Sequence, residues 1–325
     1  MIVLSFAFLA GGLAGIVYGA DLLVKGASRL ALGLGVSPLF VGITIVAVGT
    51  SLPELVVNLF GVIQGASDIG YGNVVGSNVF NILAVLGAAA LIRDIPISRA
   101  TTRIEIPLCV LSAAVLLIVA NDPFIGGAAV AQVQRSEGLL MLGFFLVFVA
   151  YTVTLARKDP EAAPFVPDES PETSERIFGR SVLQLLAGLI LLVVGGRFVV
   201  TGATDIALIV GLSERVVAIL IVAVGTSLPE LATSVAAARA GELDIAVGNA
   251  LGSCLLNAFL ILGLTASIQP VPIPTGSNLD LFAYLASSIL LFLFVFTGRG
   301  RKIDRREGGV FMMMYGAYVI ALFLV

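Results

Sequence analysis

The chain has 325 residues, of which 58% are hydrophobic and only 12% are charged. A soluble globular domain carries about 25% charged residues, so this composition excludes that class and is typical of a polytopic membrane protein. His is absent, which excludes histidine catalysis and His-ligated metals. The two Cys residues, Cys109 and Cys254, lie in apolar segments, where buried free thiols are expected.

Apolar runs of the length that crosses a bilayer recur along the whole chain. The first run contains no Lys or Arg up to Ala20, so it lacks the basic start of a cleavable signal and is predicted to be a span. All the runs are predicted to be α-helices, because a lipid-facing backbone must satisfy its own hydrogen bonds and none alternates as barrel strands do. The ten predicted spans cover residues 2–24, 36–62, 71–92, 105–120, 137–156, 181–204, 212–238, 246–267, 279–297 and 309–325.

Basic residues are distributed unevenly between the predicted loops. The loops that follow odd-numbered spans hold 15 of the 18 Lys and Arg residues, the opposite side holds Arg135 and Arg215, and Arg197 lies near a span end. The positive-inside rule therefore predicts an integral, multi-pass protein with both termini outside the cytoplasm.

One polar, Pro-, Glu- and Asp-rich segment, residues 157–180, divides the chain near its middle. It is too short for a folded regulatory domain and is predicted to be a flexible cytoplasmic linker. The two halves, residues 1–156 and 181–325, each contain five predicted spans.

The two halves contain an internal repeat. Residues 45–55 and residues 221–231 both read IVAVGTSLPEL, and residues 45–87 match residues 221–263 at 21 of 43 positions. Because each half has an odd number of spans, the second copy must have the opposite orientation in the membrane. Inverted repeats of this kind are typical of secondary transporters, whose binding site lies where the repeats meet.

Each copy of the repeat places a proline and a carboxylate inside a predicted span. Pro53 and Pro229 leave a backbone carbonyl without its helical donor and open the preceding turn. Glu54 and Glu230 follow directly, and a carboxylate in mid-span costs about 3 kcal/mol unless it is paired or solvated. Neither motif contains a basic residue, so a bound cation is the expected source of compensating charge.

Helical spacing gathers further oxygen groups on the same faces as the two carboxylates. Residues three and four positions apart share a helix face, as Thr50 and Glu54 do, and as Ser77 and Asn81 do on the next span. Hard oxygen ligands in flexible geometry favour Ca²⁺, or Na⁺ at less charged positions, over Zn²⁺ or copper. The predicted ligand groups are the carboxylates of Glu54 and Glu230, the hydroxyls of Thr50, Ser51, Thr226 and Ser227, the amides of Asn81 and Asn257, and freed carbonyls.

The motif GTSLPE followed by GNVVGSNVFN, and again by GNALGSCLLN, resembles the two alpha-repeats of the cation/calcium antiporter superfamily, in particular its prokaryotic sodium/calcium exchanger branch. The resemblance covers nearly the whole chain. It implies an all-α protein of ten transmembrane helices in two inverted five-helix repeats, located in a prokaryotic plasma membrane. It also implies exchange of Na⁺ for Ca²⁺ by alternating access, with the first and sixth spans sliding past the core.

The resemblance also implies a role for each site residue. Calcium would lie between the carboxylates of Glu54 and Glu230 and the carbonyls of Thr50 and Thr226. Sodium would be bound on one flank by Ala47, Ser51, Ser77 and Glu230, and on the other by Ala223, Ser227, Ser253 and Glu54. Cations and membrane lipid are the expected partners, with no cofactor, no nucleic acid and no counterpart of the soluble calcium-sensing domains of animal exchangers.

The sequence departs from the family pattern at two positions. Cys254 stands where the first repeat has Asn78, and Asn257 stands where many sodium/calcium members resemble one another in carrying an Asp. The missing acid makes the site less negative and leaves stoichiometry and potassium dependence open. Thr50 favours sodium coupling, because the proton-coupled relatives carry Asn there.

Three alternatives remain beside the sodium/calcium exchanger. The first is an antiporter that exchanges protons for Ca²⁺, or one that transports another divalent cation such as Mg²⁺ or Mn²⁺. Mg²⁺ is the less favoured of these cations, because it holds its water tightly. A cation channel could use the same ligands but would not require a counter-ion. An enzyme is disfavoured, because no HExxH motif or protease-like acidic pair is present.

Overall fold

The computed structural model describes residues 2–63, 68–127, 130–157, 171–209, 223–274, 277–297 and 300–324. Over these residues the fold is helical, as predicted, apart from the two-residue strands β1 (Ile95–Pro96), β2 (Gln132–Val133), β3 (Val271–Pro272) and β4 (Lys302–Ile303). The helices, of which those labelled η are π-helical, are α1 (Ile2–Leu34), α2 (Pro38–Val41), η1 (Gly42–Val46), α3 (Ala47–Thr50), α4 (Leu52–Ile63), α5 (Asp68–Phe80), η2 (Asn81–Val85), α6 (Leu86–Ile92), α7 (Arg99–Arg103), α8 (Glu105–Ala120), α9 (Asp122–Ile125), α10 (Arg135–Arg157), α11 (Pro171–Ile209), α13 (Ala223–Thr226), α14 (Leu228–Ala240), α15 (Leu243–Leu255), η4 (Leu256–Ile261), α16 (Leu262–Ile268), α17 (Asn278–Phe294) and α18 (Arg305–Leu324).

Several of these helices are long enough to cross a bilayer. In the described part of the chain, six helices have the required length and hydropathy, and the bent pair Pro38–Thr50 and Leu52–Val62 makes a possible seventh. α17 is apolar but shorter, with 17 residues. Residues 210–222, where the seventh predicted span begins, lie outside the described residues. A multi-pass helical protein is therefore confirmed, while the count of ten spans stays a prediction.

The helix α11 begins earlier than the sixth predicted span. It starts at Pro171, inside the segment predicted as linker, and runs for 39 residues to Ile209. Proline suits the first position of a helix, because its missing N–H would have no partner there in any case. Residues 158–170 of the linker lie outside the described residues.

The chain forms two compact units, each of which draws segments from both sequence halves. The first unit contains Met1–Leu52 and Thr152–Asn249, and the second contains Pro53–Tyr151 and Ala250–Val325. The interleaving means that segments of the two sequence repeats are neighbours inside each unit.

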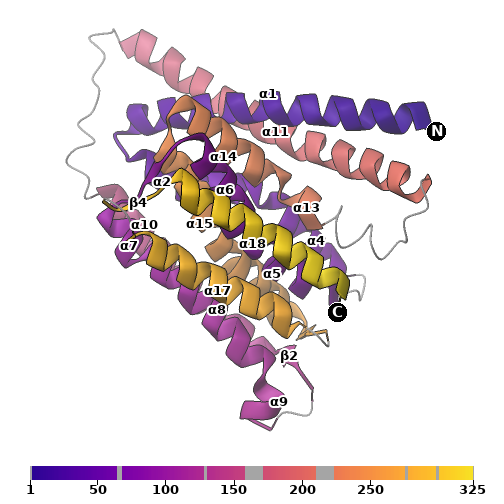
Figure 1. The fold of residues 1–325 in the computed structure, drawn as a ribbon. Helices are drawn as coiled ribbons and strands as arrows, with labels where there is room; N and C mark the ends of the chain where they lie inside the picture. Colours follow the sequence, from indigo (N-terminus) through magenta and orange to yellow (C-terminus); the bar gives the residue numbers. More distant parts are fainter. Residues whose placement is uncertain are drawn as a thin grey trace. The chain divides into compact units, whose positions relative to one another are not determined.

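In the first unit α1 lies alongside α11 (Figure 1). Glycines line the contact between the two helices. A Cβ atom added at Gly12 would lie 2.7 Å from the backbone oxygen of Gly195, and one at Gly188 would lie 2.6 Å from the backbone nitrogen of Leu23. Real Cβ atoms do not approach backbone this closely, so these positions require glycine. The glycines of this contact recur every seven residues, at Gly12, Gly19 and Gly26 in α1 and at Gly188, Gly195 and Gly202 in α11.

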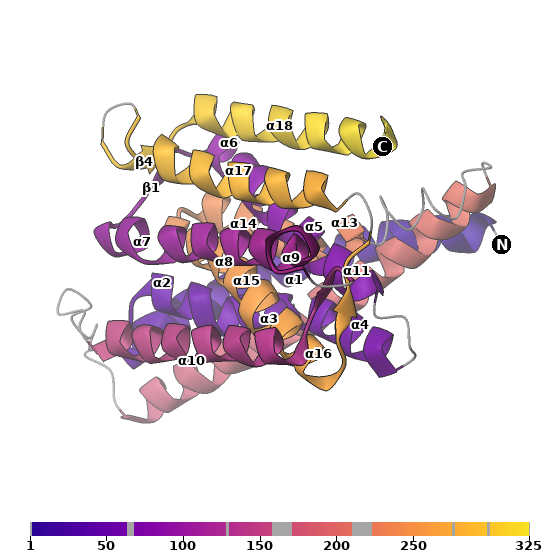
Figure 2. The same ribbon diagram turned by 90° about the horizontal axis from the view of Figure 1, so that it is seen from below.

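In the second unit α18 packs against α6, and α17 packs against α8 (Figure 2). Two short antiparallel ribbons join loops from opposite sequence halves of this unit. β1 pairs with β4, with Ile95 opposite Ile303, and β2 pairs with β3, with Val133 opposite Val271. Each ribbon joins two loops that the order of the predicted spans places on the same side of the membrane.

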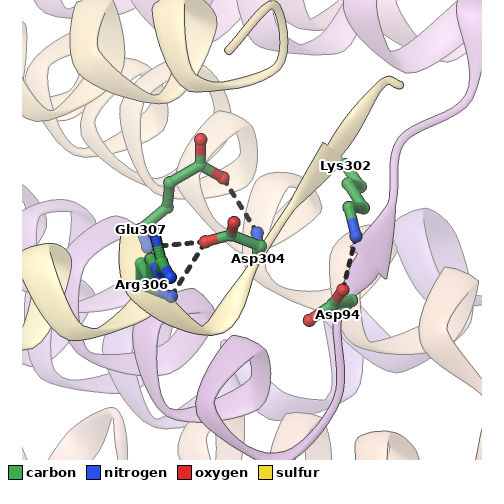
Figure 3. A network of polar contacts seen from close by, with 5 residues as sticks. All are labelled: Asp94, Lys302, Asp304, Arg306 and Glu307. Carbon is green, nitrogen blue, oxygen red and sulfur yellow. Dashed lines mark hydrogen bonds and ion pairs between the residues drawn. The ribbon is translucent and has the colours of Figure 1, made fainter. Parts of the chain in front are cut away.

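A polar network stabilises the β1–β4 ribbon and the start of α18 (Figure 3). Lys302 donates to Asp94 Oδ2 at 2.6 Å. Asp304 accepts from the backbone N–H of Glu307, and the Glu307 side chain accepts from the backbone N–H of Asp304 at 2.8 Å. This reciprocal arrangement is a capping box, which satisfies N–H groups that a helix start leaves without partners.

We predict that the β1–β4 ribbon is insensitive to pH between about 5 and 9. The hydrogen bond from Lys302 lowers the pKa of Asp94, so its contribution is complete above about 3.9 and is lost only as the pH falls through the lower folded value. The hydrogen bond to Asp94 raises the pKa of Lys302, so its contribution is complete below about 10.4 and is lost only at higher pH.

Hydrogen exchange of the Ile97 amide, which donates to the Arg301 carbonyl at 2.9 Å, measures this prediction. Protection corrected for intrinsic exchange is expected to stay flat over that range and to fall in Asp94→Asn at every pH within it. A protection curve that titrates near neutrality would show that another group controls the ribbon.

Candidate ion-binding site

Both copies of the repeated motif interrupt their helices at the serine that precedes the Leu-Pro-Glu sequence. Ser51 separates α3 from α4 with φ −84° and ψ 6°, and Ser227 separates α13 from α14 with φ −92° and ψ 6°. The breaks fall where Pro53 and Pro229 prevent the normal helical bond to the preceding turn. The predicted helix interruptions are therefore confirmed in both repeats.

In the first unit the two repeats contact each other through side chains of the motifs. Ser51 Oγ donates to Glu230 Oε1 at 3.2 Å, and Thr50 Oγ1 is 2.9 Å from Asn249 Oδ1. Glu230 is 1% exposed and Thr50 is fully buried. A carboxylate from one repeat is thus held by a hydroxyl from the other, away from water.

Asn249 connects three parts of this cluster. Its Nδ2 donates to the backbone carbonyl of Glu230 at 3.1 Å and to Ser234 Oγ at 3.0 Å, while its Oδ1 receives the Thr50 hydroxyl. Ser234 in turn donates to the carbonyl of Ala246 at 3.3 Å. These bonds hold the backbone around Glu230 in place.

The second unit contains a related cluster around Glu54. Glu54 is fully buried, and Ser77 Oγ approaches its Oε1 at 3.5 Å. Asn58 Nδ2 donates to the backbone carbonyl of Glu54 at 2.8 Å. A Cβ added at Gly70 would lie 2.6 Å from Asn58 Oδ1, so the glycine makes room for the amide. In the second repeat the smaller Ser234 stands in place of Asn58, and the larger Ala246 stands in place of Gly70.

Two amides of the second unit, Asn78 and Asn257, lie together with Cys254. Asn78 Nδ2 donates to the carbonyl of Cys254 at 3.2 Å, and Asn257 Nδ2 donates to Asn78 Oδ1 at 3.1 Å. Asn81 begins η2 and Asn257 lies in η4, and both are fully buried. π-Helical turns often occur at functional sites, because the extra residue redirects a side chain and loosens the hydrogen bonds of one turn.

Two amide oxygens, those of Asn81 and Asn257, are available to a ligand. Three amide atoms have no hydrogen-bond partner among the described residues. They are Oδ1 and Nδ2 of Asn81 and Oδ1 of Asn257. A buried polar atom without a partner is costly, and a cation would satisfy an amide oxygen. No cluster of three or more His, Cys, Asp or Glu side chains occurs within the described ranges.

The structure distributes the predicted ligands between the two units and buries nearly all of those it describes. Ala223 begins α13, but its side chain lies outside the described residues. Buried in the first unit are Ala47, Thr50, Ser51, Thr226, Ser227 and Glu230. Buried in the second unit are Glu54, Ser77, Asn81, Ser253 and Asn257.

Sequence reasoning missed the supporting amides. Asn249 and its repeat partner Asn73 match across the two halves, and this match was the available signal for Asn249. Asn58 and Asn78 have no amide at the corresponding position of the second repeat, where Ser234 and Cys254 stand. The repeat pattern therefore gave no indication that these two amides take part.

Comparison with known proteins agrees with this geometry. The family model described as "Sodium/calcium exchanger protein" matches residues 4–154 and 180–324. The chain belongs to the sodium/calcium exchanger protein family. It is accordingly a membrane ion exchanger and not an enzyme, and cation binding follows from the family.

Individual members of the family resemble the exchanger over its full length. It is 36% identical to "Inner membrane protein YrbG" of Escherichia coli, over 98% of this chain and 96% of that protein. It is 32% identical to "Sodium/calcium exchanger MaX1" of Methanosarcina acetivorans, over 100% of both. A solved structure of the sodium-calcium exchanger NCX_Mj superposes with a TM-score of 0.83 at 29% identity, over 99% of each chain. The exchanger is therefore an integral, multi-pass membrane protein.

Proposed function

We propose that this exchanger is a secondary active antiporter that exchanges Na⁺ for Ca²⁺ by alternating access. The observation that carries the proposal is the contact between the two repeats, in which Ser51 of one GTSLPE motif donates to Glu230 of the other. Two identical acidic motifs that contact each other inside apolar helices can bind a cation between the repeats and release it together.

The proposed ligands are those of the sequence prediction. Calcium is bound by the carboxylates of Glu54 and Glu230 with the carbonyls of Thr50 and Thr226, and Asn81 and Asn257 supply neutral oxygens. Oxygen-only sites of this kind favour Ca²⁺ over transition metals. The proposed sodium ligands are Ala47, Ser51, Ser77 and Glu230 on one flank and Ala223, Ser227, Ser253 and Glu54 on the other.

Competition for the two carboxylates provides the coupling. An unneutralised charge in a dehydrated passage through the protein is expensive, so only a site filled by sodium or by calcium crosses between the two faces. A protein whose site is empty does not change from one open face to the other. Each Ca²⁺ movement therefore requires a return movement of Na⁺, which makes the protein an exchanger and not a leak.

The proposed architecture is ten spans in two inverted five-helix repeats, residues 1–156 and 181–325, joined by a cytoplasmic linker at 157–180. The proposed location is a prokaryotic plasma membrane with both termini outside the cytoplasm. The two ribbons support the grouping of the loops into two sides, because β1 with β4 and β2 with β3 each join loops predicted on one side. The assignment of one side to the cytoplasm rests on the positive-inside rule. The name of the E. coli relative as an inner membrane protein agrees with the location.

Calcium uptake into reconstituted vesicles tests the proposal. Vesicles are loaded with sodium, with choline or with an acidic buffer, and external calcium-45 is added. We expect uptake only in the sodium-loaded vesicles. Uptake that follows the proton gradient alone would replace sodium coupling with proton coupling, and equal uptake under all three conditions would indicate a channel.

A further inference from the structure

The β1–β4 ribbon carries an excess of positive charge. The two segments that it joins, residues 93–103 and 301–307, contain seven basic and three acidic residues, a net charge of +4, and both belong to the second unit. Cations held this close repel one another unless anions gather beside them. Five exposed arginines of these segments form what we call the arginine patch: Arg93, Arg99, Arg301, Arg305 and Arg306.

The three acidic side chains of the two segments are already engaged within the ribbon (Figure 3). Asp94 accepts from Lys302 at 2.6 Å. Asp304 accepts from the backbone N–H groups of Arg306 and Glu307, and Glu307 accepts from the backbone N–H of Asp304. Within the described residues no ion pair includes an arginine of the patch. The guanidinium groups therefore have donors left for an anion from outside the chain.

Backbone contacts hold the two segments side by side. The amide of Ile97 donates to the carbonyl of Arg301 at 2.9 Å. Arg305 donates from Nη2 to the carbonyl of Ile92, the residue before Arg93, at 3.0 Å. The arginines from both segments thus extend from a fixed backbone, which lowers the cost of gathering them around one ligand.

Two exposed apolar side chains flank the patch. Leu91, 45% exposed, precedes Ile92, whose carbonyl accepts the guanidinium bond described above. Phe296, 60% exposed, precedes Thr297, whose hydroxyl donates to the Glu307 carboxylate. Guanidinium groups bind phosphate, and large apolar side chains pack against acyl chains. A phospholipid offers both partners, whereas a soluble anion offers only the first.

The patch also lies at the ends of membrane helices, where lipid head groups are expected. Arg93 directly follows Gly70–Ile92, which has the length and hydropathy of a span, and Arg305 is the first residue of α18. The predicted orientation places this end on the cytoplasmic side, whose leaflet contains anionic lipids. The β2–β3 ribbon differs, because its segments, residues 121–135 and 269–278, contain one basic and one acidic residue, Arg135 and Asp122.

We propose that the arginine patch binds the head groups of anionic phospholipids of the cytoplasmic leaflet, with Leu91 and Phe296 against their acyl chains. Each basic residue near an anionic membrane surface contributes about fivefold in affinity, so two or more arginines around one phosphate group give a clear preference for the anionic lipid. The inference does not depend on which cations the protein exchanges.

The absence of tryptophan from the chain makes a direct test possible. Phe296→Trp introduces a single fluorophore beside the patch, and Leu91→Trp is a second reporter if that variant does not fold. The full chain is reconstituted into phosphatidylcholine vesicles that contain either dibrominated phosphatidylglycerol or dibrominated phosphatidylcholine, because bromine quenches a neighbouring tryptophan. We expect the quenching curves to give a binding constant for phosphatidylglycerol at least about tenfold above that for phosphatidylcholine.

Matched variants separate the patch from a general effect of anionic lipid. Ile268→Trp places the reporter at a side chain that is 50% exposed and ends α16 just before β3, and its lipid ratio should lie within about twofold of one. In the Phe296→Trp protein, Arg301→Gln should lower the ratio by about fivefold. Arg135→Gln, which removes an exposed arginine beside β2, should change it by less than about twofold.

Three results would overturn the inference. The first is equal quenching by the two lipids at Phe296→Trp, and the second is an equal effect of Arg301→Gln and Arg135→Gln on the ratio. The third comes from adding inorganic phosphate at constant ionic strength, which should leave the ratio unchanged. Loss of the lipid preference in phosphate would assign the arginine patch to a soluble anion and not to the membrane.

Discussion

Glu230→Gln is expected to abolish Ca²⁺ exchange and to lower Ca²⁺ affinity by at least about 100-fold. One full charge beside a divalent cation contributes several kcal/mol even at an effective dielectric constant of about 20. The change is nearly isosteric, and the amide oxygen can still accept from Ser51, which lies 3.2 Å from the carboxylate. Because a neutral amide is easier to bury than a charge, the melting temperature should stay the same or rise. Transport by calcium-45 uptake and stability by thermal unfolding in detergent provide the two readouts.

Glu105→Gln is the matched control for this prediction. Glu105 is also a fully buried glutamate, but it lies in α8 outside the repeated motifs and accepts a hydrogen bond from Tyr151 at 2.8 Å. We expect this variant to retain exchange, and Glu54→Gln to lose it as Glu230→Gln does. If Glu105→Gln were as inactive as Glu230→Gln, buried acids in general would be required and the two motif carboxylates would have no special role.

Gly188→Val is expected to give the largest loss of stability. The added Cβ would lie 2.6 Å from the backbone nitrogen of Leu23 and 2.7 Å from the backbone oxygen of Gly19, and neither atom can rotate away. Overpacking of this kind costs about 1–3 kcal/mol or more, because α1 and α11 must separate. A lower melting temperature in detergent and loss of monodisperse protein in size-exclusion chromatography are the measurements.

Gly11→Val isolates the effect of the helix contact from the effect of valine on a helix. Gly11 lies beside Gly12 in α1, but a Cβ added there meets nothing within 4 Å. Its melting temperature should stay within a few degrees of wild type, since only helix propensity changes. Equal destabilisation by Gly11→Val and Gly188→Val would contradict the claim that glycine contacts hold α1 to α11.

The elements best predicted from the sequence depend on local chemistry. Pro53 and Pro229 predict the helix breaks, which occur at Ser51 and Ser227 in both repeats. The i, i+4 spacing of Ser77 and Asn81 predicts a common face, and both side chains are buried in the second unit. Proline geometry and helix periodicity act over a few residues, so a single sequence contains them.

Other features depend on contacts between distant segments and were not predicted. The bond between Thr50 and Asn249 joins residues 199 positions apart, and the bond between Asn257 and Asn78 joins residues 179 positions apart. No local sequence pattern predicts the π-helical turns η2, which begins at Asn81, and η4. The glycines of α1 and α11 do have one, a spacing of seven residues, which indicates a close helix contact but not the partner helix.

Sodium-22 efflux from reconstituted vesicles, measured when Ca²⁺ is added outside, tests directly whether the two ions are exchanged. We expect external Ca²⁺ to accelerate sodium efflux, in step with calcium-45 uptake into the same vesicles, and Glu230→Gln to remove both fluxes together. Calcium uptake that leaves the rate of sodium efflux unchanged would contradict the proposed exchange.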